Sequence, residues 1–544
     1  MKLKQDSTAQ KLRGAYYTPS RLADAIVGLF NAENVYHILE PSCGDGVFLD
    51  SIYSNGILQR ADSVTAIEIE AEEIDKVQKR YGEYHNMNIL CEDFFDFYHR
   101  SFDENKYDLI LGNPPYIRYQ YLTEKQRELQ SMILTSHGMK ANKLINAWVC
   151  FLVACVKMLS ENGRIAFVIP AEILQVAYAE DLRLFLSEQL SRITLITFEQ
   201  LVFPEIEQEV IVFIGEKGGE EQGIRIIEMT DLDCFMNLDL ESNGYQRLQH
   251  VREKWTKYFI SPSETLLVQR LREDNRFMRF KEFGIINVGI TTGNNDYFSV
   301  TDEIEEQYNL SSVTLPLIGR SSHAHGIFFT ADDWASNANN GKKAKLVKFP
   351  EIPFDEYPNE HKSYIARGED EGQNIGYKCS IRERWYIVPS VWVPDAFFLR
   401  RNNLYPKFVL NRCGAVSTDT MHRMRFNEGV DEENILLSYY NSVSFAFTEI
   451  CGRSYGGGVL EILPGEMGDI LLPIVKTIEP ALRDDLLVQV DAIIRNGDDI
   501  EDALDLVDEK LLVDMLGIEA EICRQCRKIW KKLQKRRLGR SSSV

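Results

Sequence analysis

The sequence lacks both a long apolar run and an excess of positive charge. No run reaches the roughly 18 apolar residues that a membrane-spanning helix needs. The first residues, MKLKQDSTAQKLRG, also lack the apolar stretch of a signal peptide, so we expect a cytoplasmic protein with no membrane partner. Lysine and arginine total 61 against 82 aspartates and glutamates, for a net charge of -21. This balance argues against a simple DNA-coating protein, although a locally basic cleft can still bind DNA.

Cysteine and histidine offer little evidence for a metal site. The ten cysteines are scattered along the chain, which favours reduced thiols over a disulfide framework. Cys523 and Cys526 form one CxxC pair, but no second pair follows at zinc spacing, so we interpret them as structural or incidental. His323 and His325 lie in a glycine-containing loop, and we interpret them as surface residues. The sequence therefore predicts no metal centre.

A chain of 544 residues is too long for a single hydrophobic core, and its residue composition and hydrophobic pattern change along its length. Residues 35 to about 214 alternate short apolar runs with helical stretches, which is typical of a parallel α/β sheet. The predicted strands are Val35–Glu40, Val64–Ile69, Asn88–Cys91, Tyr107–Leu111, Arg164–Ile169, Ile193–Phe198 and Val210–Ile214. Between them, residues 142–159 place apolar side chains at helical spacing, which predicts a helix with one buried stripe. Residues 216–223 are predicted to be a loop that closes the sheet domain.

These patterns predict a Rossmann-like, seven-stranded α/β domain over residues 1–240. A mixed α+β domain is expected over residues 241–480, where glycine, asparagine and aromatic residues are frequent and short β-like runs are separated by turns. A helical region with a basic tail is expected over residues 481–544. The tail from Arg524 to Arg540 carries nine lysines or arginines, and we interpret it as a solvated helix or as an arm that contacts phosphates.

Three loops in the first domain are predicted to meet at one nucleoside. The first predicted strand runs into a turn with two glycines, Gly44 and Gly46, which let the backbone bend tightly and approach a ligand. Such a turn alone also occurs in many ordinary strand-to-helix connections. The second strand ends at Glu68, whose carboxylate can accept hydrogen bonds from two ribose hydroxyls, and Ile69 can lie against an adenine face.

The residues of the third loop, together with the absence of a phosphate-binding motif, indicate which nucleoside cofactor binds. Asp93 can accept a hydrogen bond from the adenine amino group of a cofactor, and Phe94 can cover its ring. No phosphate-binding G-x-x-x-x-G-K-[ST] motif accompanies the three loops. The loops therefore fit S-adenosylmethionine better than ATP.

The loop Asn113-Pro114-Pro115-Tyr116 follows the fourth predicted strand directly. An adenine amino nitrogen is a poor nucleophile because its lone pair is delocalised into the ring, so acceptors must hold its N–H groups in a more pyramidal geometry. The side-chain oxygen of Asn113 and the backbone carbonyl of Pro114 can provide two acceptors, held in place by consecutive prolines. Tyr116 can stack on a base that has been flipped out of the duplex. A merely rigid turn is the alternative interpretation, and the position after three cofactor loops argues against it.

The order and spacing of these segments resemble the TaqI-type gamma class of N6-adenine DNA methyltransferases. The resemblance covers most of the chain and implies S-adenosylmethionine as methyl donor, double-stranded DNA as substrate and a C-terminal target-recognition domain. It also implies host protection in a restriction-modification system, with any cognate restriction endonuclease acting separately. We further expect a monomer.

The resemblance assigns roles to further residues. In the segment GAYYTP, Tyr17 and Thr18 are similar to residues that pack on the methionine part of the cofactor. Phe203 resembles a second aromatic partner of the flipped base, although the residue pattern alone fits a core position equally well. The remaining cofactor positions that the resemblance implies are Glu40, Pro41, Cys43, Gly44, Gly46, Asn113 and Pro115. Residues 288–295 and 454–461 are similar to recurring segments of the recognition domains.

Other functions fit the sequence less well. Enzymes that methylate a glutamine side chain in proteins share the NPPY loop but are usually far shorter. A bifunctional restriction-methylation enzyme usually places a nuclease before the cofactor motifs, and only about 15 residues precede them here. A DNA-binding protein without catalysis is disfavoured by the intact NPPY loop. In the C-terminal half, Arg382, Arg384 and Arg412 are candidate contacts to bases or phosphates, with surface ion pairs as the alternative.

Overall fold

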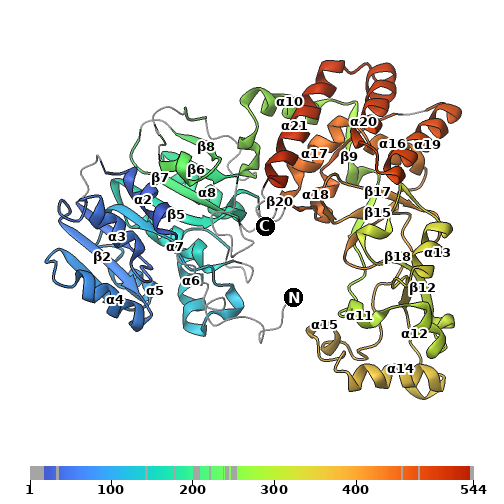
Figure 1. Ribbon diagram of the computed structural model, residues 1–544, viewed down its shortest axis with the longest axis horizontal. Coiled ribbons are helices and arrows are strands. Elements are labelled where there is room, and N and C mark those ends of the chain that lie inside the picture. Colours follow the sequence, from blue (N-terminus) through green and yellow to red (C-terminus); the bar gives the residue numbers. More distant parts are fainter. Residues whose placement is uncertain are drawn as a thin grey trace. The chain divides into compact units, whose positions relative to one another are not determined.

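The computed structural model describes residues 18–31, 36–140, 145–175, 179–199, 209–219, 222–236, 238, 240, 244–246, 254–454, 458–475 and 478–539. The chain forms two compact units that divide between Pro262 and Ser263 (Figure 1). The second unit extends to Leu538, so the helices after residue 480 belong to the same unit as residues 263–480. Among the described helices, none combines the length and the apolar character that a membrane crossing requires.

An eight-stranded sheet in the order β3-β2-β1-β4-β5-β7-β6-β8 forms the centre of the first unit. Its strands are β1 (His37–Glu40), β2 (Ser63–Glu68), β3 (Met87–Cys91), β4 (Tyr107–Gly112), β5 (Leu159–Pro170), β6 (Arg192–Phe198), β7 (Val210–Glu216) and β8 (Gly223–Met229). Strand β7 runs antiparallel to both of its neighbours, and the other pairs are parallel. The predicted Rossmann-like fold is confirmed. Strand β8 was not predicted, because its apolar residues are interrupted by Arg225 and Glu228, as in an edge strand.

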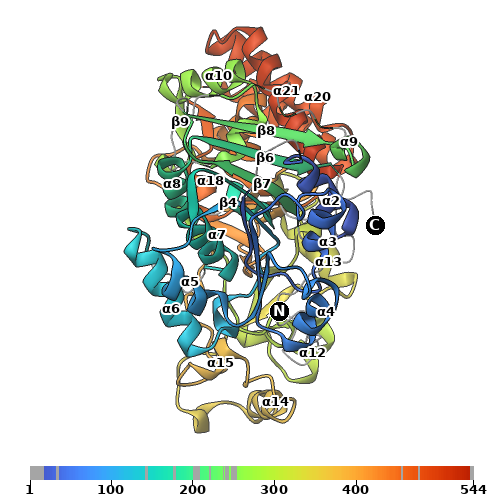
Figure 2. The same ribbon diagram turned by 90° about the vertical axis from the view of Figure 1, so that its left-hand side faces the viewer.

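Helices cover both faces of this sheet (Figure 2). One face carries α2 (Ser20–Gly28), α3 (Val47–Ser54) and α4 (Ala71–Tyr81), and the other carries α5 (Phe94–Ser101), α6 (Glu124–Ser136), α7 (Ala147–Lys157) and α8 (Glu180–Gln189). The predicted buried stripe on α7 is confirmed, and burial extends to every residue from Ala147 to Val156. Helix α7 packs against β5, α6 and α8 together, which explains why its sequence is apolar on all sides.

The second unit contains a five-stranded sheet in the order β10-β19-β15-β17-β13 and a four-stranded sheet in the order β11-β14-β12-β18. Smaller sheets have the orders β16-β21-β20 and β22-β9. The strands are β9 (Phe277–Arg279), β10 (Gly284–Val288), β11 (Ser299–Val300), β12 (Thr314–Ile318), β13 (Phe328–Phe329), β14 (Lys345–Val347), β15 (Ala396–Leu399), β16 (Arg401–Asn402), β17 (Phe408–Asn411), β18 (Val416–Ser417), β19 (Met421–Phe426), β20 (Arg453–Ser454), β21 (Leu460–Glu461) and β22 (Leu471–Pro473). The expected mixed α+β architecture is present.

Helices of the second unit are distributed along its sequence, and those after residue 480 follow its last strand. The helices are α10 (Pro262–Glu273), α11 (Asn295–Phe298), α12 (Asp302–Gln307), α13 (Ala331–Asn339), α14 (Asn359–Asp370), α15 (Tyr377–Ser380), α16 (Glu432–Tyr439), α17 (Ser442–Cys451), α18 (Pro464–Gly468), α19 (Pro480–Asn496), α20 (Ile500–Val507) and α21 (Ala520–Leu538), with a π-helix at Asp508–Met515. Helix α21 packs against α17. The interpretation of the tail as a solvated helix is wrong for Arg537, which is 1% exposed and ion-paired with the buried Glu449 at 2.9 Å.

Two smaller predictions about side chains have different outcomes. His325 is exposed, but His323 is buried, so its interpretation as a surface residue is wrong. Burial lowers the pKa of His323 to about 4, so its ring is neutral near pH 7. Cys523 and Cys526 are both buried free thiols on α21, as a structural interpretation requires.

Candidate functional site

The glycine turn after β1 is held against the end of β2 by backbone contacts. Gly44 and Gly46 have φ angles of 51° and 86°, in the left-handed region that favours glycine. A Cβ atom on Gly46 would lie 2.9 Å from Nη2 of Arg80 and 3.0 Å from Cγ2 of Val77, so a side chain there would require these neighbours to shift. The amide of Cys43 donates to the carbonyl of Ile67 at 2.9 Å. The turn thus adopts the tight conformation that the sequence predicts.

Glu68 connects this turn to the second cofactor loop. Its Oε2 accepts a hydrogen bond from the amide of Gly44 at 2.9 Å, and its Oε1 accepts from the amides of Ile69 and Glu70 at 2.9 and 3.1 Å. The side chain of Ile69 is 55% exposed, which leaves its apolar surface available to a ligand. Glu68 therefore lies beside the glycine turn, and the contacts of Glu68 and Ile69 with a cofactor stay predictions.

Glu40, at the end of β1, is a buried carboxylate with an unsatisfied oxygen. Its side chain is 1% exposed, and among the described residues no donor reaches Oε2. Burial raises the pKa of Glu40 well above its ordinary value, and the neighbouring carboxylates of Glu68 and Asp45 raise it further. A buried acceptor without a donor is costly unless a bound molecule supplies one. This acceptor and the surrounding negative charge fit the cationic groups of S-adenosylmethionine.

In the third loop, both carboxylate oxygens of Asp93 accept hydrogen bonds within the protein, which the sequence did not predict. Asp93 caps α5, because its Oδ1 accepts from the amide of Phe95 at 2.8 Å. Its Oδ2 accepts from Nε2 of Gln126 at 2.8 Å. The sequence did not identify Gln126, since no motif marks a glutamine on α6. Phe94 is 3% exposed and its ring stacks on Phe151 at 4.7 Å, so covering an adenine ring stays a prediction for this residue.

The NPPY loop lies directly beside the glycine turn. Strand β4 pairs in parallel with β1 on one side and with β5 on the other, and Asn113 follows its last residue. The hydroxyl of Ser42 donates to the backbone carbonyl of Asn113 at 3.5 Å. Pro114 is buried, whereas Asn113 and Pro115 are partly exposed. The loop that was predicted to bind the substrate base thus borders the predicted cofactor site.

Tyr116 is more enclosed than a simple stacking platform. Its side chain is 8% exposed, and its hydroxyl donates to the carbonyl of Val168 on β5 at 3.1 Å. This hydrogen bond fixes the orientation of the ring relative to the sheet. Stacking on a base stays a prediction.

The other predicted site residues divide into two groups. Thr18 is 6% exposed and lies just before α2, while Pro41 and Cys43 are buried in the glycine turn. Tyr17 and Phe203 lie outside the described residues, as do residues 455–457 of the second recognition-domain segment.

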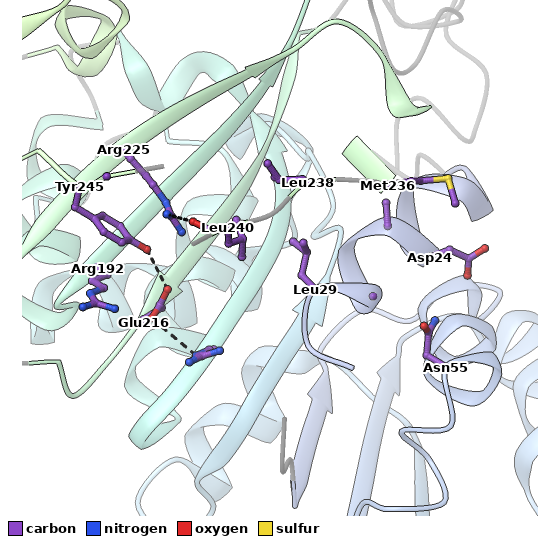
Figure 3. A pocket seen from close by; sticks show the side chains of 14 residues that line it. Asp24, Leu29, Asn55, Arg192, Glu216, Arg225, Met236, Leu238, Leu240 and Tyr245 are labelled. Atoms are coloured by element: carbon purple, nitrogen blue, oxygen red, sulfur yellow. Dashed lines mark hydrogen bonds and ion pairs between the residues drawn. The ribbon is translucent and has the colours of Figure 1, made fainter. Parts of the chain in front are cut away.

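A cavity of about 710 Å³ in the first unit contains none of these residues (Figure 3). Its wall includes Tyr245, whose ring centroid lies 5.2 Å from the guanidinium carbon of Arg192 and 4.1 Å from that of Arg225. The hydroxyl of Tyr245 donates to Glu216 at 3.2 Å. Arg192 begins β6 and Arg225 follows the start of β8, so the cavity lies toward the amino ends of these strands. The predicted cofactor loops follow the carboxyl ends of β1 to β4.

Two family models match consecutive parts of the chain. Residues 49–203 match the Eco57I restriction-modification methylase family. Residues 252–512 match the C-terminal domain of the type II methyltransferase M.Eco57I. The first match contains the NPPY loop, and the second lies almost entirely in the second unit.

Curated relatives extend this likeness over nearly the whole chain. The type II methyltransferase M.AccI of Acinetobacter calcoaceticus is 23% identical over 524 residues, covering 92% of this chain and 93% of the relative. M.HincII of Haemophilus influenzae is 30% identical over 233 residues, covering 42% of each chain.

Solved structures agree on the fold. The Type IIL restriction-modification enzyme MmeI, solved in complex with DNA, superposes with a TM-score of 0.55 at 12% identity, covering 98% of this chain and 80% of that chain. The two family matches and the relatives together support a restriction-modification DNA methyltransferase that uses S-adenosylmethionine, with parts that are similar to Eco57I-type domains.

Proposed function

We propose that this enzyme transfers the methyl group to N6 of an adenine flipped out of double-stranded DNA, at a specific sequence. The observation that carries the proposal is the contact between Ser42 and Asn113, which joins the glycine turn to the NPPY loop. An amino nitrogen held by the NPPY loop would then lie close to a methyl group held by the cofactor loops. Methyl transfer requires this proximity.

Several residues fit the cofactor. Glu40 offers a buried acceptor to an amino group, Glu68 lies where ribose hydroxyls would bind, and Ile69 offers an apolar surface. S-adenosylmethionine supplies an electrophilic methyl group on a sulfonium when it is bound. The negative charge around Glu40 favours a cationic ligand over its neutral product.

The NPPY residues position and activate the base. The Asn113 side-chain oxygen and the Pro114 carbonyl accept hydrogen bonds from the two N6 protons, which draws the lone pair out of conjugation with the ring. The two prolines restrict the backbone, so these acceptors need little reorganisation. Tyr116 and Phe203 stack on the extruded base and offset part of the few kcal/mol that flipping costs.

The second unit supplies target recognition in this proposal. Its match to the C-terminal domain of M.Eco57I supports a role in DNA methylation rather than in methylating a protein glutamine. We also propose that the enzyme acts as a monomer and serves as the modification component of a restriction-modification system, with any cognate endonuclease acting separately.

The test is to sequence plasmid DNA from cells that express the enzyme, with a method that distinguishes N6-methyladenine from other methylated bases. We expect N6-methyladenine at one sequence motif, and none from cells that express Asn113→Ala. The variant should still bind S-adenosylmethionine in calorimetric titrations. Methylated cytosine, methylation of a protein glutamine without DNA methylation, or full activity of the variant would overturn the proposal.

A further inference from the structure

One edge of the five-stranded sheet in the second unit carries polar and apolar side chains on the same face, and three of them are exposed. Strand β10 forms an edge of this sheet and pairs antiparallel with β19. In this register Ile285 lies opposite Arg425 and Asn287 lies opposite Arg423, so all four side chains point to the same face. Arg425, Asn287 and Ile285 are exposed, with Ile285 at 62%.

Arg423 is buried beside this face and holds Trp392 in position. It is 4% exposed and donates from Nε to the carbonyl of Val288 at 3.0 Å and from Nη1 to the carbonyl of Ser390 at 2.9 Å. Ser390 has a φ of 58°, an uncommon conformation for a serine, in the loop that carries Trp392. The guanidinium carbon of Arg423 lies 4.4 Å from the centroid of the Trp392 ring. The tryptophan is therefore fixed by a buried cation.

Trp392 in turn orients Arg425. The guanidinium carbon of Arg425 lies 4.6 Å from the same ring centroid. Within the part of the chain that the structure describes, the Arg425 guanidinium takes part in neither an ion pair nor a hydrogen bond. Stacking restricts the side chain without using its N–H donors, so the guanidinium remains able to form two parallel hydrogen bonds.

Three other arginines of this unit form hydrogen bonds or ion pairs within the fold. Arg382 donates to the carbonyls of Thr291 and Trp385, at 2.9 and 3.2 Å. Arg384 donates to the carbonyl of Ile352 at 2.6 Å. Arg412 pairs with two glutamates, at 2.7 and 3.4 Å. The structure therefore disfavours these three arginines, which the sequence suggested as DNA contacts.

The free groups match the edges of base pairs. Arginine forms paired hydrogen bonds with guanine, asparagine does so with adenine, and apolar side chains contact the thymine methyl group. Diagonal neighbours on adjacent strands lie about 7–8 Å apart. This separation is close to two steps of DNA, at about 3.4 Å each. Asn287 and Arg425 are such diagonal neighbours, and Asn287 likewise makes no side-chain hydrogen bond in the described structure.

We propose that Arg425, Asn287 and Ile285 form a surface that reads base pairs in the major groove of the target DNA, with Arg425 contacting a guanine. We name these three residues the edge surface. Trp392 and Arg423 act as positioning residues for it. The proposal rests on the proposed function, because it requires duplex DNA as the substrate.

The test compares methylation rates on a library of duplexes in which each position of the wild-type target is varied. We expect Arg425→Ala and Arg425→Lys to lose roughly 10- to 100-fold of the discrimination at one G·C pair, because lysine keeps the charge but not the paired donors. Asn287→Ala should relax a nearby position instead. Arg412→Ala is the control, because the guanidinium of Arg412 is held by glutamates in the wild type. The preference of this variant for each base of the target should match that of the wild type.

Different failures have different meanings. A uniform loss of binding across all DNA sequences would overturn base reading. If the salt dependence of binding also fell by the amount expected for about one phosphate contact, Arg425 would be shown to contact the DNA backbone. An unchanged profile in both Arg425 variants would also overturn it. If the wild type methylates no DNA, the proposed function itself fails and the edge surface loses its substrate. Thermal unfolding and S-adenosylmethionine titration of each variant verify that it is folded.

Discussion

The hydroxyl of Ser42 donates to the backbone carbonyl of Asn113 at 3.5 Å and links two loops that lie 71 residues apart in the chain. The contact forms because β1 and β4 are parallel neighbours, so both loops leave the same edge of the sheet. Ser42 thus belongs to the turn expected to hold the methyl donor, and Asn113 to the loop expected to hold the acceptor.

Ser42→Ala should therefore affect catalysis more than cofactor binding. Loss of one long hydrogen bond removes about 1 kcal/mol, which predicts a fall in kcat of roughly fivefold with the KM for S-adenosylmethionine nearly unchanged. Steady-state methylation kinetics measure both constants. Ser54→Ala is the control, because its hydroxyl bonds to the carbonyl of Ser51 within α3. Equal effects in both variants would contradict a role for the contact in aligning the loops.

Glu40→Gln should stabilise the cofactor-free enzyme at neutral pH. The pKa of Glu40 in the folded state is raised above its ordinary value of 4.5, so the fold favours the protonated form. Its contribution to stability is present below pH 4.5 and is lost as the pH rises through the raised pKa. Glutamine does not titrate, so the variant should gain over the wild type with rising pH. Urea unfolding from pH 4.5 upward measures the difference in free energy.

The same variant should bind S-adenosylmethionine roughly 10- to 100-fold more weakly, because a cationic ligand favours the ionised form of Glu40 and glutamine cannot ionise. Glu188→Gln, at an exposed position on α8, is the control for both measurements. Unchanged affinity in Glu40→Gln would show that this carboxylate does not contact the cofactor.

Gln126→Glu should weaken cofactor binding through Asp93. The new side chain keeps the oxygen that accepts from the amide of Thr123, but it places a second carboxylate against Oδ2 of Asp93. Repulsion between the two carboxylates favours protonation of one of them, which weakens a hydrogen bond from the adenine amino group. We expect the KM for S-adenosylmethionine to rise roughly tenfold with kcat largely preserved. Gln120→Glu adds the same charge at an exposed position, and an equal rise there would contradict the role of Asp93.

Arg537→Leu should destabilise the second unit by about 3–5 kcal/mol, because it leaves the carboxylate of Glu449 buried and unpaired. Arg537 also donates to the carbonyl of Gly458 at 2.7 Å. Arg524→Leu, which breaks an exposed and solvent-screened pair with Glu521, should cost much less. Chemical denaturation of both variants measures the contrast. Similar small losses would show that the pair on α21 is not a structural anchor.

The local patterns of the chain predict much of the first unit. Apolar runs mark the positions of β1 to β7, and the two glycines mark the turn after β1. Strand β8 escaped prediction because it is an edge strand with a mixed pattern, and the full burial of α7 depends on elements that pack around it. The contact of Gln126 with Asp93 spans 33 residues, so no local pattern marks it.

Motif and period are properties of neighbouring residues, and for that reason the sequence alone predicted the Rossmann-like sheet and located the glycine turn and the NPPY loop. Whether an arginine forms an ion pair or keeps its donors available is not a property of its neighbours in the sequence. Arg412 and Arg425 look alike in the sequence, yet folding brings glutamates to the first and a tryptophan ring to the second. Strand pairing across 140 residues places Ile285 opposite Arg425, and this long-range packing leaves the Arg425 guanidinium without an ion pair or hydrogen bond among the described residues.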